Sequence, residues 1–65
     1  MRLLVNGEER EVAASAVDGL VTELGLDPRK VAVELNLAIV PRSTYAQAAL
    51  SDGDRIEIVQ FVGGG

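Results

Sequence analysis

The stretch RLLVNGEEREVA, residues 2–13, decides the fold that the sequence predicts. Its centre is Asn6-Gly7, the strongest short signal for a β-hairpin, because both central positions of a type I′ turn require positive φ. Residues 2–5, which are apolar from Leu3 to Val5, therefore predict a first strand, and residues 9–13 predict the strand that returns beside it. The charges on the return strand suit an exposed edge of a sheet.

One amphipathic helix is expected after this hairpin. Apolar residues recur there at the i, i+3, i+4 and i+7 positions: Val17, Leu20, Val21 and Leu24. Ser15 is placed to cap the N-terminus of the helix, and Gly25 is placed to end it. Gly19, inside the helix, is expected to allow close packing of the helix against a sheet.

The rest of the chain predicts further strands. Val31, Val33 and Leu35 alternate with Ala32 and Glu34, as in a strand with one buried face. The expected elements, in order, are a strand over 31–35, a short strand over 38–40, an irregular helical turn within 43–50, a turn cluster over 51–54 and a last strand over 55–62.

This order of elements favours the α+β class. A hairpin, a right-handed crossover helix and a last strand that returns beside the first give a mixed sheet around one helix. We therefore expect a β-grasp, ubiquitin-like fold, with a mixed sheet of four to five strands packed on one main helix. The predicted domain covers residues 1–62, and residues 63–65 form a flexible glycine tail.

Composition excludes several functions. A chain of 65 residues has room for one domain, and its 48% hydrophobic share is enough for a core. It contains neither Cys nor His, so it lacks a thiol nucleophile, the usual general base and the usual zinc ligands. A net charge of −4 disfavours nucleic acid as a partner. Because no apolar run reaches the roughly 18 residues of a membrane span, we expect no membrane contact and a cytoplasmic domain.

Three glycines, Gly63-Gly64-Gly65, carry the strongest functional signal. Glycine loses the most conformational freedom on ordering, so this run has no structural benefit after a strand. It has three interpretations: a frayed end, a passive spacer, or a working terminal carboxylate. The third has a chemical logic, because ATP can activate a carboxylate and a narrow tunnel in an activating enzyme would admit only a segment without side chains.

The strand before the glycines is apolar on both of its expected faces. Val59, Phe61 and Val62 break the alternation that Ile56 and Ile58 begin. One interpretation is a locally two-sided core or a bulge that exchanges faces. The other is an exposed apolar patch at the base of the tail, which docks a partner.

An enzymatic role has little support in the sequence. Asp52 and Asp54 are the best acidic pair, and on either side of Gly53 they are typical of turn residues. No motif supplies further metal ligands, so no metal site is expected. The rival from another class is a β-grasp module that only binds partners.

Several motifs along the chain together resemble one family. They are Val5-Asn6-Gly7, Val31 to Asn36, Val40-Pro41-Arg42, Asp52-Gly53-Asp54, Ile56 to Val59 and Phe61 to Gly65. Their combination resembles the ThiS family, the sulfur carriers of thiamine thiazole synthesis, over essentially the whole length. One departure is Leu37, where family members often have Gly, and it puts the type of the second hairpin turn in doubt.

The resemblance implies a carrier and not a catalyst. The carboxylate of Gly65 would be adenylated by a ThiF-type adenylyltransferase that consumes ATP, and a sulfur-donor system would convert it to a thiocarboxylate. Thiazole synthase would then receive the sulfur. Gly63 and Gly64 would enter the partner active sites, and Val59, Phe61 and Val62 would dock. The carrier would hold no permanent cofactor and would be monomeric when free. Related carriers for molybdopterin or tRNA thiolation remain alternatives.

Overall fold

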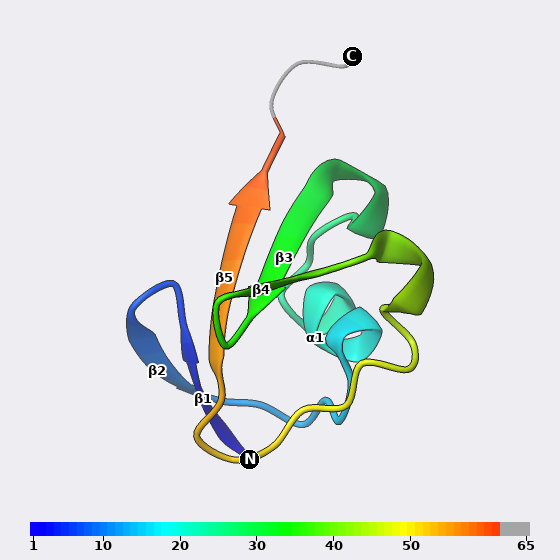
Figure 1. Cartoon of the computed structure of the whole chain (residues 1–65). Coiled ribbons are helices and arrows are strands. Elements are labelled where there is room, and N and C mark those ends of the chain that lie inside the picture. Colours follow the sequence, from blue (N-terminus) through cyan, green and yellow to red (C-terminus); the bar gives the residue numbers. More distant parts are fainter. Residues whose placement is uncertain (62–65) are drawn as a thin grey trace.

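The computed structural model describes residues 1–61 of the chain (Figure 1). In chain order its elements are β1 (Arg2–Val5), β2 (Glu8–Glu11), α1 (Val17–Glu23), the 3-10 turn η1 (Pro28–Lys30), β3 (Val31–Leu35), β4 (Ala38–Val40), the 3-10 turn η2 (Arg42–Thr44) and β5 (Arg55–Gln60).

The strands form one mixed sheet in the order β2-β1-β5-β3-β4. The central pair, β1 and β5, is parallel, while β1 with β2, β3 with β4 and β3 with β5 are antiparallel. Helix α1 lies on one side of this sheet (Figure 1). The structure therefore confirms the predicted β-grasp architecture on one main helix, with five of the expected four to five strands.

The first hairpin has the predicted turn. Asn6 and Gly7 have φ values of 50° and 83°, and Val5 pairs directly with Glu8 across them. These values fit a two-residue type I′ turn. The return strand runs over 8–11 and not 9–13, and all four of its residues are exposed. Its charges therefore protect an outer edge of the sheet from pairing with other chains.

The predicted N-cap of the helix is wrong. Helix α1 begins at Val17 after Ala16, and no side chain caps it. Its first amides bind carbonyl groups of the irregular segment that precedes β5: the N–H of Val17 donates to Ala48 O at 3.0 Å, and that of Asp18 to Tyr45 O at 3.1 Å. Non-local backbone acceptors have thus taken the place of the Ser15 hydroxyl.

The predicted end of the helix is confirmed. Gly25 has φ 77°, and its N–H donates to the carbonyl of Thr22. The next amide, that of Leu26, donates to the carbonyl of Val21. This pair of bonds is a Schellman motif, which needs a residue in the left-handed conformation.

Gly19 packs against a different neighbour from the one predicted. A Cβ atom at this position would lie 3.3 Å from the Cβ of Ala14. Ala14 belongs to the segment between β2 and α1, and not to the sheet. The missing side chain therefore lets this connection cross close to the helix.

An ion pair holds the turn that leads into β3. Asp27 accepts hydrogen bonds from the guanidinium and the backbone N–H of Arg29. The side-chain bond from Arg29 is the main reason why the pKa of Asp27 is lowered to about 2. Because this folded-state pKa lies below the usual 3.8, the contribution to stability is present above about pH 4 and is lost as the pH falls toward 2.

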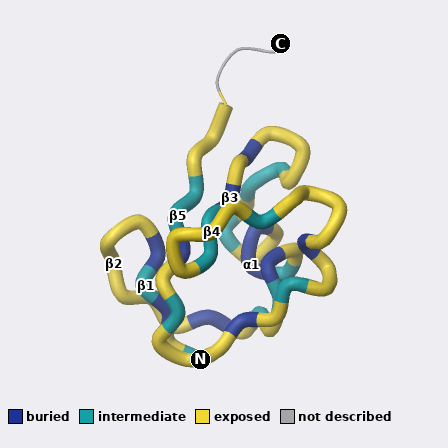
Figure 2. The backbone as a smooth tube through the Cα atoms, viewed as in Figure 1, coloured by how far each residue is buried: buried dark blue, intermediate teal, exposed yellow. Residues whose placement is uncertain are grey.

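The core lies between the sheet and α1 (Figure 2). Leu20 and Ile56 have no exposed surface, and they come from the helix and from the central strand. Tyr45 is the buried aromatic residue, and the rest of the buried core is aliphatic. The buried set is Leu3, Val5, Val12, Val17, Leu20, Val21, Val31, Val33, Tyr45, Leu50 and Ile56.

The second hairpin keeps the type I′ conformation without glycine. Asn36 and Leu37 have φ values of 51° and 72°, and Leu35 pairs with Ala38 across them. Left-handed backbone is unfavourable for a residue with a Cβ atom. Leu37 is also 71% exposed, so its side chain gains little from packing.

We expect Leu37→Gly to stabilise the protein. Glycine adopts the left-handed conformation without strain, so the free energy of unfolding should rise by about 1 kcal/mol. The measurement is urea unfolding followed by circular dichroism. Leu37→Ala is the control, because it removes the exposed side chain and keeps the strain. An equal gain in both variants would show that the backbone of Leu37 is not the cause.

Candidate docking face and C-terminal segment

Strand β5 lies at the centre of the sheet and carries Val59, the first of the predicted docking residues, while Phe61 directly follows the strand. Its pairing with β3 runs without a bulge from Leu35 opposite Ile56 to Val31 opposite Gln60. Ile56 and Ile58 pack into the core, while Val59 and Phe61 are 60% and 53% exposed. The interpretation as a two-sided core is therefore wrong for Val59 and Phe61, and the predicted exposure of these two residues is confirmed.

The exposed residues form an apolar surface on the side of the sheet away from α1. Val59 pairs with Ala32, which is also exposed. Ile39 of the edge strand β4 is 76% exposed and pairs with Glu34, two positions from Ala32 on the same face. We call Ala32, Ile39, Val59 and Phe61 the outer apolar face. Figure 2 shows the end of β5 in the exposed colour.

Ala32 and Ile39 were not among the predicted docking residues, and Ile39 is the larger and more informative of the two. The stretch Ala38–Val40 is apolar throughout, so its sequence did not distinguish an inward from an outward side chain. The useful signal was its place beside Glu34, because a residue directly opposite an outward-facing charge must itself face outward.

Two carboxylates border the outer apolar face. Glu34 and Glu57 lie directly opposite each other on β3 and β5. Within residues 1–61 neither has a cationic group within 4.0 Å. Like charges at opposite positions of a sheet are unfavourable, so this pair adds negative potential beside the apolar residues. The face therefore suits a partner surface that is apolar at its centre and carries cationic groups beside it.

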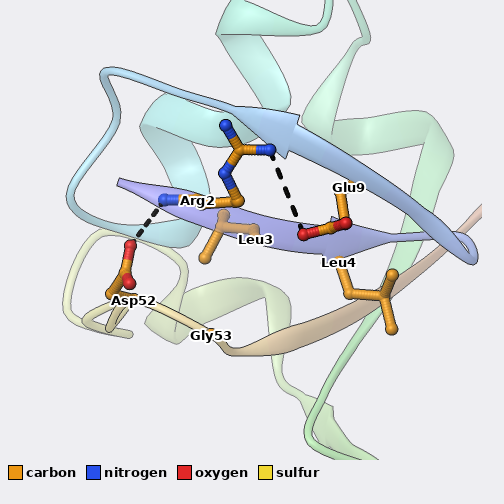
Figure 3. A pocket seen from close by; sticks show the side chains of 6 residues that line it. All are labelled: Arg2, Leu3, Leu4, Glu9, Asp52 and Gly53. Carbon is orange, nitrogen blue, oxygen red and sulfur yellow. Dashed lines mark hydrogen bonds and ion pairs between the residues drawn. The ribbon is translucent and has the colours of Figure 1, made fainter.

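The acidic turn before β5 has the structural role that the sequence predicts. Asp52 accepts the backbone N–H of Arg2 at 2.7 Å, and Asp54 accepts the backbone N–H of Ser51 at 2.8 Å. A shallow hollow of about 430 Å³ lies beside this turn (Figure 3). Its charged side chains already have partners, because Asp52 accepts the backbone N–H of Arg2 and the guanidinium of Arg2 lies 4.0 Å from Glu9. The hollow is at the opposite end of β5 from Phe61.

Two further observations concern residues 1–61. This part of the chain has no group of three or more His, Cys, Asp or Glu side chains that could hold a metal ion. It also has no helix with the length and apolar character needed to cross a membrane.

Four predicted site residues, Val62, Gly63, Gly64 and Gly65, lie outside the described residues. Their predicted roles, and the predicted boundary between the domain and the glycine tail, therefore stay predictions. Phe61 is the last described residue before them, and its N–H donates to Lys30 O at 2.8 Å. The sheet thus remains paired up to the residue that precedes this segment.

The architecture and the outer face define the chain as a ubiquitin-like protein of the β-grasp class. The model of the ThiS family matches residues 3–65. The chain belongs to the ThiS family. It is 35% identical to the sulfur carrier protein ThiS of Escherichia coli (strain K12), over the full length of both chains.

The chain also matches a solved structure of a ThiS protein and a segment of a longer relative. The crystal structure of the thiamine biosynthesis protein ThiS from Geobacter metallireducens superposes with a TM-score of 0.84, at 33% identity and full coverage of both chains. A thiazole synthase of Paramagnetospirillum magneticum is 62% identical over the whole of this chain. This chain spans only 20% of the length of that relative.

Proposed function

We propose that this protein is a sulfur carrier of thiamine biosynthesis. The observation that supports this proposal most is the full-length match to the sulfur carrier ThiS of E. coli. The outer apolar face adds a physical reason, because an exposed apolar surface of this kind marks a contact with another protein. Two of its residues, Val59 and Phe61, lie at the end of β5 and directly after it, on the segment that leads into the glycine run.

The proposed chemistry takes place at the carboxylate of Gly65. An oxygen atom of this carboxylate attacks the α-phosphorus of ATP in a ThiF-type adenylyltransferase, and pyrophosphate leaves. A sulfur-donor system then displaces AMP from the carbonyl carbon and leaves a thiocarboxylate. The carrier is a cosubstrate in this reaction and not an enzyme. It holds no permanent cofactor, since the activating partner consumes the ATP.

The end of β5 and the segment after it would bring the reacting group to its partners. Val59 and Phe61, with Val62 after them, would dock on the adenylyltransferase through the outer apolar face. Gly63 and Gly64 would then enter the active site, where the absence of side chains allows the backbone to be closely surrounded. The same strand would serve both steps, because β5 carries the docking residue Val59 and leads through Phe61 to the glycines that end in the reacting carboxylate.

Thiazole synthase is the proposed acceptor of the sulfur. The relative from Paramagnetospirillum magneticum carries the name thiazole synthase, and a segment of it is 62% identical to this chain. Because a longer protein with that name contains a segment similar to this carrier, the carrier and thiazole synthase would act in the same reaction sequence. In that sequence thiazole synthase consumes the thiocarboxylate and returns the carrier with its carboxylate restored.

The test is the intact mass of the carrier after reaction. The 65-residue chain is incubated with ATP, a ThiF-type adenylyltransferase and a sulfur donor, with E. coli ThiS in parallel as the positive control. We expect a mass increase equal to the replacement of one oxygen by one sulfur, located at Gly65. If E. coli ThiS is loaded and this chain is not, the proposal is wrong. Sulfur that reaches molybdopterin synthase and not thiazole synthase would assign the carrier to another pathway.

The docking role of Phe61 gives a separate prediction. Because the side chain is 53% exposed, Phe61→Ala should lower the free energy of unfolding by less than ~1 kcal/mol. It should weaken binding to the adenylyltransferase about tenfold, as expected for an aromatic residue at an interface. Calorimetry measures the affinity, and urea unfolding measures the stability. Unchanged affinity would remove Phe61 from the docking surface.

A further inference from the structure

Strand β1 ends before β5 does. The parallel pairing of the two strands consists of Leu4 opposite Arg55 and Val5 opposite Ile56. The chain then leaves the sheet in the turn at Asn6 and Gly7, while β5 continues to Gln60. Within residues 1–61, no residue of β1 therefore lies opposite the second half of β5. The backbone of that half would lack a partner on this side.

The side chain of Asn6 continues the pairing where β1 stops. Its Oδ1 accepts the N–H of Ile58 at 2.7 Å, and its Nδ2 donates to the carbonyl of Ile58 at 3.2 Å. The carboxamide thus offers one acceptor and one donor, as a backbone peptide group of a neighbouring strand would. The backbone N–H of Asn6 also donates to Ile56 O at 2.8 Å. One residue binds two successive inward-facing positions of β5.

The turn conformation of Asn6 makes this contact possible. Its φ of 50° is one that Asn adopts more readily than most residues. A hollow of about 400 Å³ lies beside the same contact and is lined in part by Val5, Ile58 and Gln60. Within residues 1–61, the carboxamide of Asn6 is therefore the last hydrogen-bonding partner of β5 on the β1 side, and the strand beyond it borders this hollow.

The second hairpin provides an internal comparison. Asn36 occupies the equivalent turn position with φ 51°, and its side chain also binds β5. Its Oδ1 accepts the N–H of Arg55 at 2.9 Å, and its Nδ2 donates to Asp54 Oδ1 at 3.0 Å. Asn36 thus holds the start of β5, while Asn6 holds the half that leads to Val59 and Phe61.

We infer that Asn6 is a positioning residue for the proposed carrier function. It keeps the second half of β5 in the plane of the sheet, so that Val59 and Phe61 are ordered before a partner binds. Without the carboxamide, this half would be held on one side only, by its pairing with β3. More of its ordering would then fall to the binding step, and that cost would weaken the complex. The effect of Asn6 on partner binding rests on the proposed function. The contact between Asn6 and β5 does not depend on it.

The experiment compares Asn6→Gly with Asn36→Gly. Glycine keeps the type I′ turn in both variants, so each loses only the side-chain bonds to β5. Hydrogen exchange should speed up about tenfold at the Ile58 amide in Asn6→Gly, and by a similar factor at the Arg55 amide in Asn36→Gly. Sulfur loading should then show a KM for the carrier about tenfold higher in Asn6→Gly, with kcat unchanged. Asn36→Gly should load like the wild type.

Asn6→Asp serves as a second variant with a milder change. It keeps the acceptor for the N–H of Ile58 and loses the donor to its carbonyl, so its KM should lie between those of the wild type and Asn6→Gly. This variant remains informative if Asn6→Gly does not fold.

Three outcomes decide the inference. Unchanged exchange at Ile58 in Asn6→Gly would overturn the contact. Faster exchange at Ile58 with a KM equal to that of the wild type, or an equal rise in KM in Asn36→Gly, would overturn the positioning role. If the wild type takes up no sulfur, the proposed function fails and the delivery role with it, while exchange at Ile58 still decides whether Asn6 holds the strand.

Discussion

Deletion of Gly64 and Gly65 will abolish sulfur loading of an otherwise folded domain. The buried core of residues 1–61 takes its last member, Ile56, from β5, so we expect the deletion to leave the stability unchanged. The shortened chain would end at Gly63, two residues nearer to the docked sheet, and each residue of extended chain spans at most about 3.3–3.6 Å. A carboxylate that ends roughly 7 Å short cannot reach the bound ATP. Intact mass after reaction with the adenylyltransferase measures the loss.

A second variant separates the effect of chain length from the effect of an added side chain. Gly64→Ala keeps the length and adds one methyl group, so loading should slow strongly without disappearing. Ser51→Ala is the control, since Ser51 lies in the turn before β5, and it should load like the wild type. Loading of the shortened chain at a normal rate would show that the terminal carboxylate does not have to reach a fixed site.

Ile56→Ala will unfold most of the protein at 25 °C. Ile56 is fully buried at the centre of the sheet, and removal of its outer carbons should cost about 2–5 kcal/mol. A core of this size supplies only roughly 3–5 kcal/mol of net stability. Urea unfolding followed by circular dichroism should show little or no folded baseline.

The control for Ile56→Ala lies on the same strand. Val59 is 60% exposed, so Val59→Ala should lower the free energy of unfolding by less than ~1 kcal/mol. A cooperative transition for Ile56→Ala close to that of Val59→Ala would contradict the assignment of β5 as the centre of the core.

Features set by short stretches of sequence could be predicted. Asn6-Gly7 predicts a type I′ hairpin because few other residues adopt positive φ at both positions, and the structure has that turn. Gly25 predicts the end of α1 for the same reason. The apolar spacing from Val17 to Leu24 predicts the buried face of the helix, and the structure buries Val17, Leu20 and Val21.

Features set by contacts between distant segments could not be predicted. Ser15 has the chemistry of a cap, but the first amides of α1 bind carbonyl groups near residue 45, almost thirty positions away in sequence. The two interpretations of the end of β5 were equally consistent with the sequence. The structure decides between them. Val59 pairs with Ala32 of β3 on the outer side of the sheet, and nothing in residues 1–61 covers it there.

The second hairpin shows how tertiary contacts can override a local preference. Leu37 made the turn type uncertain, yet the turn is type I′. Asn36 next to it is held by its backbone N–H, which donates to Arg55 O at 2.7 Å, and by its side-chain bonds to Asp54 and Arg55. The backbone bond holds the turn in place, the side-chain bonds tie it further to β5, and Leu37 adopts the strained conformation.

The parallel pairing of β1 with β5 has a consequence for how the protein is made. A ribosome completes β1 first and β5 last among these strands, so the centre of the sheet cannot close until nearly all of residues 1–61 have emerged. Residues 1–61 should therefore fold in one all-or-none step, with no stable partial domain before β5 has been made. The strand that completes the fold also carries Val59 and leads to Phe61. An unfinished or misfolded chain thus lacks the surface that an activating enzyme would recognise, so activation would itself select chains that have folded.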